Sequence, residues 1–333
     1  MPRLDQVRNE IDTLLPQKSW ISNKAIAVLL PCYNEEQAIT QVIQEFRSAL
    51  PSAQIYVYDN NSTDNTKSVA EKAGAIVRSE PLQGKGNVVR RMLADINADI
   101  YILADGDGTY DPTSAGKLIE KLITHNLDMV VGTRLSKEGA YRPGHKSGNK
   151  LFNRIVANLF GDGFTDILSG YRVLSKRFAK SFPAASSGFE IETELSIHAL
   201  DLRLATAEIA LPYGTRAEGT ASKLKTFSDG IRILWTILQL YKELKPLSFF
   251  LCLSFFLCLS AFAIGLPVFV DYLNTGALSS VMLTILSAGI LQLSFISAIA
   301  GLILSSISHG RREFKRMHFL KLQAISELGT TLD

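Results

Sequence analysis

The stretch Tyr101-Ile-Leu-Ala-Asp105-Gly-Asp107-Gly-Thr-Tyr110 runs from an apolar strand directly into two carboxylates that are one residue apart. If strand geometry persists, residues i and i+2 lie on the same side, so Asp105 and Asp107 converge. Gly106 would let the backbone approach a ligand closely. An oxygen-only site of this kind suits Mg²⁺ or Mn²⁺ held against a diphosphate. An Asp/Gly-rich turn after a strand explains the fragment equally well, so the rest of the chain has to decide.

Short apolar runs alternate with amphipathic segments over the first part of the chain. The expected strands are 25–30, 55–59, 75–78, 100–104 and 129–133, and the expected helices begin at Gln37, Thr66, Asn87 and Ser114. This alternation predicts an α/β domain with a mostly parallel sheet and helices on both faces. Ligands of such sheets bind beyond the carboxyl ends of the strands. Polar clusters follow the first, second and fourth expected strands, which predicts one site at this edge.

Gly84-Lys85-Gly86-Asn87 supplies a basic element before the third expected helix. The glycines expose backbone N–H groups, a helix start favours anions, and Lys85 adds a point charge suited to a diphosphate. The motif is neither a Walker loop nor a dinucleotide-binding fingerprint. Taken alone, it fits a solvated turn better.

Two long charge-free runs dominate the C-terminal part of the chain. No Asp, Glu, Lys or Arg occurs within 246–270 or within 272–310. Each run is long enough to cross roughly 30 Å of hydrocarbon as a helix. The connection between them carries no Lys or Arg, whereas basic residues flank the outer ends, which predicts a hairpin in the plasma (inner) membrane with both termini cytoplasmic. A buried helical hairpin inside a soluble core is the alternative.

The predicted organisation has five parts. They are an amphipathic helix over 1–24, a catalytic domain over 25–228, an interfacial amphipathic helix over 229–245, a hairpin over 246–310 with spans at about 247–270 and 280–307, and a basic cytoplasmic tail over 311–333. Residues 1–24 lack the uninterrupted apolar core of a secretion signal, so the catalytic domain is expected to stay on the cytoplasmic side. No nucleic-acid partner is expected.

Six short polar segments, including the acidic pair, follow one another along the chain in an order that resembles a known family. They are Pro31-Cys-Tyr-Asn-Glu35, Asp59 with Ser62 and Asp64, Asp105-Gly-Asp107, Gly132-Thr-Arg134, Asp166-Ile-Leu-Ser-Gly-Tyr-Arg172, and Arg216-Ala-Glu-Gly-Thr-Ala-Ser-Lys223. In this order they resemble the membrane-anchored members of glycosyltransferase family two, near the dolichyl-phosphate mannose synthases and bactoprenol glucosyltransferases. The resemblance covers about residues 25–225 and implies a GT-A type nucleotide-sugar-binding domain.

The resemblance also implies roles for individual residues on the donor side. Pro31, Tyr33, Asn34, Glu35 and Asp59 would cradle the nucleobase and ribose, Asp105 with Gly106 would lie near the nucleoside, and Arg216 and Lys223 would contact the donor's phosphates. Asp107 would hold the metal, with Asp105 as a second ligand. Where the mannose synthases have a Gln that completes the metal site, this chain has Thr109, so water or Asp111 could fill that place.

On the acceptor side, Arg134 matches the lipid-phosphate arginine of the family, and Arg142, Lys150 and Arg172 are further candidates. A solvated basic loop beside an anionic bilayer explains Arg142 and Lys150 equally well. Asp166 occupies the place usually assigned to a base. A lipid monophosphate is largely a dianion at neutral pH, by analogy with phosphorylated side chains, and hardly needs deprotonating. We therefore expect Asp166 to position the acceptor or the basic groups around it.

Three acidic residues, Glu190, Glu192 and Glu194, begin a further expected helix. Two of the three are expected only to complement the helix dipole, while Glu190 faces the sugar.

The sequence leaves three functions open. The first is transfer of a sugar, from UDP-glucose or secondly GDP-mannose, to an undecaprenyl or dolichyl phosphate by an inverting displacement, with a homo-oligomer expected from the resemblance. The second is a processive polysaccharide synthase, which would be expected to carry a Gln-x-x-Arg-Trp signature and more spans. The third is a non-catalytic nucleotide-sugar-binding membrane protein.

Overall fold

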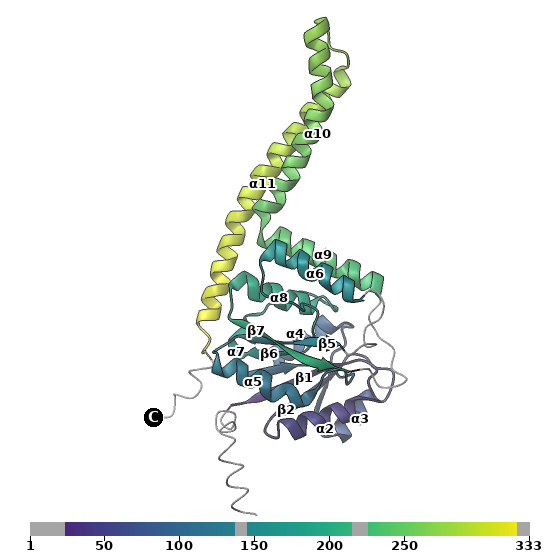
Figure 1. Ribbon diagram of the computed structural model, residues 1–333, viewed down its shortest axis with the longest axis vertical. Helices are drawn as coiled ribbons and strands as arrows, with labels where there is room; N and C mark the ends of the chain where they lie inside the picture. The colour runs from purple at the N-terminus through teal and green to yellow at the C-terminus, as the bar shows by residue number, and fades with distance from the viewer. Residues whose placement is uncertain (1–23, 137–144, 215–225, 325–333) are drawn as a thin grey trace, which may run out of the picture. The chain divides into compact units, whose positions relative to one another are not determined.

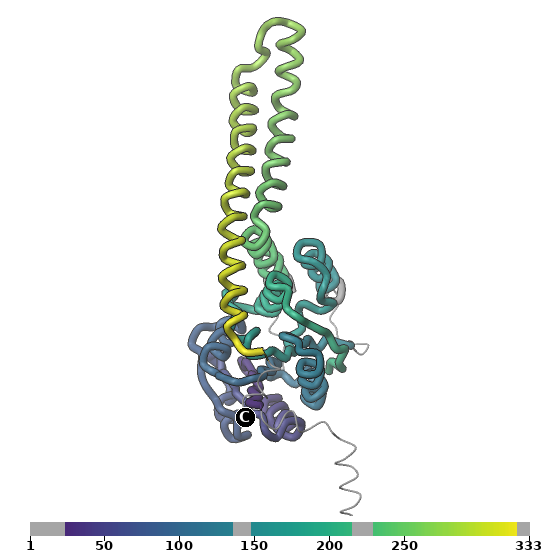
Figure 2. The backbone as a smooth tube through the Cα atoms, turned by 90° about the vertical axis from the view of Figure 1, so that its left-hand side faces the viewer, coloured from purple at the N-terminus to yellow at the C-terminus, as the bar shows by residue number. Residues whose placement is uncertain are grey.

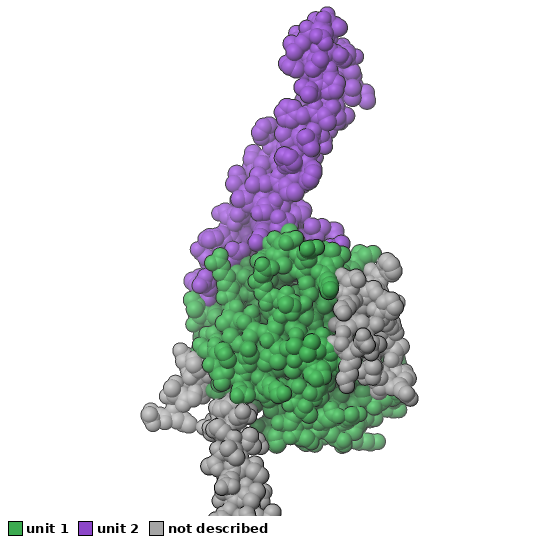
Figure 3. Space-filling model, in the orientation of Figure 1, with its two compact units in different colours: residues 1–233, 318–333 green, residues 234–317 purple. Residues whose placement is uncertain are grey.

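The computed structural model describes residues 24–136, 145–214 and 226–324. The chain divides into two compact units, one formed by residues 1–233 with 318–333 and the other by residues 234–317 (Figure 3). Residues 1–23 of the predicted N-terminal helix and residues 325–333 of the predicted tail lie outside the described residues. The five predicted divisions of the chain therefore stay predictions.

A seven-stranded sheet forms the centre of the first unit, in the order β3-β2-β1-β4-β6-β5-β7 (Figure 1). The strands are β1 (Ile26–Cys32), β2 (Gln54–Asp59), β3 (Ile76–Ser79), β4 (Ile100–Leu103), β5 (Met129–Ser136), β6 (Arg172–Ser175) and β7 (Thr206–Tyr213). Only β6 runs antiparallel to its neighbours β4 and β5, and the other pairs are parallel. The prediction of a mostly parallel α/β sheet is thus confirmed. Strands β6 and β7 lie beyond the five that the sequence indicated.

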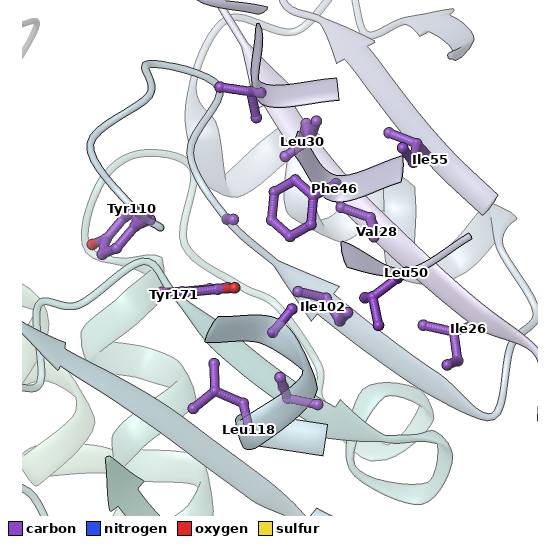
Figure 4. Packing of buried hydrophobic residues seen from close by; sticks show 14 of the residues in the cluster. Ile26, Val28, Leu30, Phe46, Leu50, Ile55, Ile102, Tyr110, Leu118 and Tyr171 are labelled. Carbon is purple, nitrogen blue, oxygen red and sulfur yellow. The ribbon is translucent and has the colours of Figure 1, made fainter. Parts of the chain in front are cut away.

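Apolar residues cover both faces of the central strands because consecutive side chains of a strand point in opposite directions. In β1, Val28 and Leu30 join one buried cluster, and Ala27 and Leu29 join the other. Helices α2 (Ile39–Ala49) and α5 (Ala115–Thr124) pack on the first cluster, where Phe46 lies with residues of β1 and β4 (Figure 4). Helices α4 (Lys85–Asp95), α7 (Lys176–Ser181) and α8 (Ile191–Leu202) pack on the second.

The order of the strands places a switch point between β1 and β4. After β1 the chain builds outward through β2, helix α3 (Thr66–Lys72) and β3, and then crosses back to β4 on the other side of β1. Ligands of open α/β sheets bind outside the carboxyl ends of the strands at such a point. The end of β1 and the loop after it carry Pro31 to Glu35, and the turn after β4 carries the Asp105–Asp107 pair, so the fold brings two of the predicted polar clusters to one edge.

Three further helices belong wholly or partly to the first unit. A short 3-10 helix, η1 (Pro112–Ser114), precedes α5, and α6 (His145–Phe160) precedes β6. Helix α9 (Thr226–Leu244) covers most of the segment predicted to lie at the membrane interface, and Ile231 and Trp235 on it are exposed. Its interfacial role stays a prediction.

Two long apolar helices form most of the second unit, α10 (Pro246–Thr275) and α11 (Val281–Leu320), which run side by side (Figure 2). Ser254 and Ser294 tie them together, because each hydroxyl donates to the other residue's carbonyl at 2.9 Å. Gly301 allows close approach, since a Cβ there would lie 2.8 Å from Phe250. With mean hydropathies of 2.5 and 2.1, both helices are long and apolar enough to cross a membrane.

Candidate active site at the carboxyl edge of the sheet

The loops after β1 and β2 are held together by side-chain hydrogen bonds to backbone N–H groups. The N–H of Asn34 donates to Ser62 Oγ at 2.9 Å, and the N–H of Thr63 donates to Asn34 Oδ1 at 2.8 Å. The N–H of Glu35 donates to Thr66 Oγ1 at 2.8 Å. Asn34 itself has a φ of 53°, a left-handed conformation that Asn adopts more readily than most residues. The two predicted donor-binding loops are therefore one connected structure.

Asp59, at the end of β2, is buried in this structure with one oxygen unused. Its Oδ2 accepts from the N–H of Ser62 at 3.3 Å, whereas its buried Oδ1 has no hydrogen-bond partner. An unpaired buried acceptor is costly, so such an atom suits a ligand that brings an N–H or O–H donor. Pro31, near the end of β1, and Tyr33, in the loop after β1, are partly exposed. These residues fit the nucleoside side of a donor site.

The acidic pair lies in a turn and not on a strand, because β4 ends at Leu103. The condition under which strand alternation would make Asp105 and Asp107 converge is therefore not met. A Cβ at Gly106 would lie 2.5 Å from Cys32 Sγ. Gly106 is thus explained by the close packing of this turn against the end of β1, and not by room for a ligand.

Asp107 is oriented by the backbone and the hydroxyl of Thr109. Asp107 is 4% exposed, and its Oδ1 accepts from the Thr109 N–H at 3.1 Å and from the Thr109 hydroxyl at 2.6 Å. The suggestion that Asp111 completes a metal site does not fit the structure. Both Asp111 oxygens cap η1, accepting from the Thr113 N–H at 2.9 Å and from Ser114 Oγ at 2.7 Å.

Lys85 lies between two carboxylates at the start of α4. Its Nζ bonds to Asp105 Oδ1 and lies 2.5 Å from Glu192 Oε1. Burial lowers the pKa of Lys85, but the two carboxylates outweigh burial and raise its pKa above the usual value, so the ammonium stays charged. The side chain of Glu192 is 4% exposed. Glu192 therefore has a specific cationic partner, which corrects the expectation that it could serve only the helix dipole.

The glycines around Lys85 are explained by packing. A Cβ at Gly84 would lie 2.2 Å from the carbonyl oxygen of Ser187, and one at Gly86 would lie 2.2 Å from that of Ser186. Only glycine permits this approach of the loop before α8 to the start of α4. The N–H of Gly84 also donates to Asn60 Oδ1 at 2.7 Å. Asn60 follows β2 directly, and the sequence interpretation did not give it this role.

Arg134 and Asp166 form a second ionic cluster. Asp166 accepts from Arg134 Nε at 2.8 Å, from Nη2 at 2.7 Å and from the backbone N–H at 3.2 Å, and Asn149 Nδ2 donates to it at 3.1 Å. Burial raises the pKa of Asp166, but the hydrogen bonds and charge of Arg134 outweigh burial and hold its pKa below the usual value. Glu208 fixes the backbone behind the pair by accepting from the N–H of Thr165 at 2.9 Å. Asp166 is thus an ionised partner of Arg134.

The segment from Asp166 to Gly170 connects the two clusters. A Cβ at Gly170 would lie 3.0 Å from Asp105 Oδ2 and 3.1 Å from Lys85 Nζ, so the backbone there lies against the first cluster. The N–H of Gly170 donates to the Tyr110 hydroxyl at 2.8 Å. Four residues of chain span at most about 14 Å, so Asp166 and Gly170 lie within that distance of each other.

The remaining basic candidates of the donor and acceptor sides either lie in different environments or fall outside the described residues. Arg172 is fully buried, and its guanidinium donates to the carbonyl oxygens of Ser169 at 2.9 Å and Ile167 at 2.8 Å. The prediction that it contacts an acceptor phosphate therefore does not fit. Lys150 is exposed on α6. The other three candidates, Arg142, Arg216 and Lys223, lie outside the described residues.

The residues fit a divalent ion only if a ligand shares it. In the described parts of the chain, no three His, Cys, Asp or Glu side chains are grouped so that they could hold a metal. Asp105 and Asp107 offer two carboxylates, and Mg²⁺ typically takes one or two carboxylates and completes its shell with water and substrate phosphates. Their chemistry thus suits an ion that arrives with a diphosphate.

Comparison with known proteins agrees with this geometry. Residues 27–182 match the family model "Glycosyl transferase family 2". The chain is 33% identical to glycosyltransferase AglJ of Haloferax volcanii over 89% of this chain and 98% of that protein, and 29% identical to a dolichyl-phosphate hexose transferase of the same organism over 66% of this chain and 94% of that protein. A glucosyl-3-phosphoglycerate synthase from Mycobacterium tuberculosis, solved with Mn²⁺, UDP and phosphoglyceric acid, matches with 25% identity and a TM-score of 0.57 over 68% of this chain and 81% of that one.

These matches confirm the resemblance that the six sequence segments indicated, and they confirm the GT-A type fold. The solved relative carries Mn²⁺ with its nucleotide, which supports divalent metal use in general. The match to AglJ extends over 89% of this chain. The protein is a glycosyltransferase that uses a nucleotide sugar, and it belongs to glycosyl transferase family 2.

Proposed function

We propose that this enzyme transfers a hexose from a nucleoside diphosphate sugar to a polyprenyl phosphate at the cytoplasmic face of the plasma membrane. UDP-glucose is the first candidate donor and GDP-mannose the second, and the acceptor is an undecaprenyl or dolichyl phosphate. The dolichyl-phosphate hexose transferase among the relatives supports this class of acceptor. The two apolar helices support a membrane location. A homo-oligomer stays a prediction.

One observation carries the proposal: a single short segment joins two separate cationic centres, each held by carboxylates. Lys85 lies with Asp105 at one end, and Arg134 lies with Asp166 at the other. Transfer to a lipid phosphate brings two anionic phosphates together, one leaving with the nucleotide and one attacking. Each phosphate needs its own positive charge, and the spacing of at most about 14 Å between the ends of the segment allows both charges to face one sugar.

The donor side stabilises the negative charge that develops on the departing diphosphate. Lys85 remains an ammonium in this site, and a fixed cation in a poorly solvated environment stabilises developing charge more strongly than one in water. A divalent ion at Asp107 and Asp105 would supply further Lewis-acid stabilisation of the same leaving group. Thr109 keeps the Asp107 carboxylate in one orientation for that purpose.

The acceptor side orients an anion that is already nucleophilic. We assign Arg134 to the lipid phosphate, because its planar guanidinium suits phosphate oxygens. Asp166 contacts three donors of Arg134, so it fixes the direction of that side chain. The lowered pKa of Asp166 makes it a weak proton acceptor at neutral pH. Asp166 is therefore proposed as a positioning residue and not as the base.

The test is a transfer assay with the full-length protein. Purified enzyme is incubated with undecaprenyl phosphate and radiolabelled nucleotide sugars, with Mg²⁺, with Mn²⁺ or after chelation, and label entering the organic phase is counted. We expect one sugar to be transferred, and we expect Asp107→Ala and chelation each to abolish transfer. Asp111→Asn is the matched control, since Asp111 only caps η1, and it should retain activity.

Other outcomes separate the remaining functions. Nucleotide-sugar binding without transfer to any lipid would indicate a non-catalytic binding protein. Label in long polymer would indicate a processive synthase. Full transfer by Asp107→Ala, or by chelated enzyme, would refute the metal-dependent mechanism.

A further inference from the structure

Glu192 is a buried acid whose position the proposed reaction has not yet used. It lies in the first turn of α8 with its Oε1 2.5 Å from Lys85 Nζ, and its Oε2 is buried without a hydrogen-bond partner. A buried carboxylate in this state is unfavourable unless it serves a charged neighbour. Helix-dipole complementarity alone does not explain the contact with Lys85.

We propose that Glu192 is a positioning residue that retains Lys85 at the donor diphosphate when Asp105 turns to the metal-bound donor. The proposal rests on the proposed function, because it requires a diphosphate donor and a divalent ion. Lys85 has two carboxylate partners in the structure, and only Asp105 belongs to the pair expected to meet the metal. Glu192 is then the carboxylate that remains in contact with Lys85.

The charges of the cluster support this exchange. One ammonium and two carboxylates give the Lys85–Asp105–Glu192 cluster an excess of one negative charge. A divalent ion held by Asp105 and Asp107 would offset the negative charge of this region, which would suit the diphosphate that accompanies it. Without Glu192, Lys85 would lose its remaining carboxylate partner whenever Asp105 turned away, and a long flexible lysine would no longer be directed to one place.

The loop before α8 also holds Glu192 in a fixed position. Its neighbour Glu194 accepts from the N–H of Ala185 at 2.9 Å and from that of Ser186 at 2.8 Å. The same loop touches the start of α4, where a Cβ at Gly86 would lie 2.2 Å from the Ser186 carbonyl oxygen. One loop thus sets the positions of both α8 and α4. The distance between Glu192 and Lys85 is therefore fixed at both ends.

The experiment compares binding of UDP with binding of uridine by the full-length protein in the presence of Mn²⁺, using displacement calorimetry. Uridine reports the nucleoside site and lacks the phosphates that Lys85 would contact. In Glu192→Gln we expect UDP affinity to fall about tenfold, the loss typical of a removed charge-assisted contact, and uridine affinity to stay unchanged. Glu192→Asp keeps the charge and should restore part of the UDP affinity. GDP and guanosine replace this pair if the wild type prefers guanine.

The matched control is Asp128→Asn, which removes one charge from a buried ion pair with Arg177 outside the site and leaves Lys85 with both partners. It should lower the melting temperature without changing the ratio of UDP to uridine affinity. An unchanged ratio in Glu192→Gln, or an equal loss for UDP and uridine, would overturn the inference. Failure of the wild type to bind UDP or GDP would instead overturn the proposed function, and the inference with it. If Glu192→Gln does not fold, the ratio in Glu192→Asp decides, and an unchanged ratio there counts against the inference.

Discussion

Replacement of Asp166 by Asn tests whether this carboxylate positions Arg134 or removes a proton. The substitution keeps the shape of the side chain and one acceptor oxygen, but it removes the charge that faces Arg134 Nε and Nη2. If Asp166 only orients Arg134, the variant should lose activity to a similar degree at every pH. If Asp166 takes a proton in the rate-limiting step, solvent hydroxide should progressively replace it as the pH rises.

The expected size of the loss follows from burial. The Arg134 and Asp166 side chains are 13% and 7% exposed, so solvent screens the pair only weakly. A hydrogen bond to a charged group contributes about 1.5–3 kcal/mol, and removing one partner of a buried pair costs about 3–5 kcal/mol. Because Asn keeps one acceptor, we expect a loss of about 2 kcal/mol, which corresponds to roughly 30-fold in kcat/KM.

The assay measures kcat/KM for lipid glycosylation between pH 6 and 9, together with the free energy of unfolding in urea. Asp128→Asn is the matched control, because Asp128 is also buried and accepts from Arg177 Nη2 at 3.1 Å outside the site. The control should lose similar stability and keep its kcat/KM. A larger loss in Asp166→Asn that recovers with increasing pH would refute the positioning role and identify Asp166 as a base.

Three further predictions concern the same edge of the sheet. Thr109→Val removes the hydroxyl that donates to Asp107 at 2.6 Å and should lower kcat about tenfold, whereas Thr109→Ser should retain most activity. Gly106→Ala should lower the free energy of unfolding by about 1–3 kcal/mol, since its Cβ would lie 2.5 Å from Cys32 Sγ, and Cys32→Ala in the same chain should restore part of it; no loss in denaturant titrations would contradict this. The lowered pKa of Asp166 stabilises the fold above its unfolded value of about 3.9, and this contribution is lost as the pH falls through the folded pKa, so wild-type stability should fall more steeply below about pH 4 than that of Asp166→Asn.

The sheet could be predicted where apolar runs are short and bounded by turn residues. The five strands indicated by the sequence all appear, because the runs around Val28 and Ile102 are buried on both faces. Strand β6 was missed because it belongs to a segment that was interpreted as part of the acceptor site. That interpretation also misplaced Arg172, which is buried among backbone carbonyls. A charged residue type predicts exposure, and the exception could only be found from the packing around it.

The residues of the candidate site could be predicted from the sequence, but the ion pairs between them could not. The sequence indicated Lys85 because it begins a helix, Asp105 because it follows a strand, and Arg134 and Asp166 because their segments resemble the family. The partner of Lys85 on α8 lies far away in the sequence, and no local pattern distinguishes Glu192 from its acidic neighbours. Contacts of this kind depend on how helices such as α4 and α8 pack against one another on one face of the sheet. They are the part of the site that a structure is needed to find.

The pairings give the two cations a common property that bears on catalysis. Lys85 and Arg134 are each largely buried, and each is held by carboxylates that keep it charged and pointed in one direction. A cation fixed in this way does not have to reorganise when a phosphate arrives, and preorganised charge is the main source of transition-state stabilisation in many enzymes. Asp105 and Asp166 also compete with the phosphates for the donors of Lys85 and Arg134, so ground-state binding is weakened, whereas Glu192 is proposed to direct Lys85 to the diphosphate. The arrangement should therefore favour the transition state, in which phosphate charge is redistributed, over tight binding of either substrate.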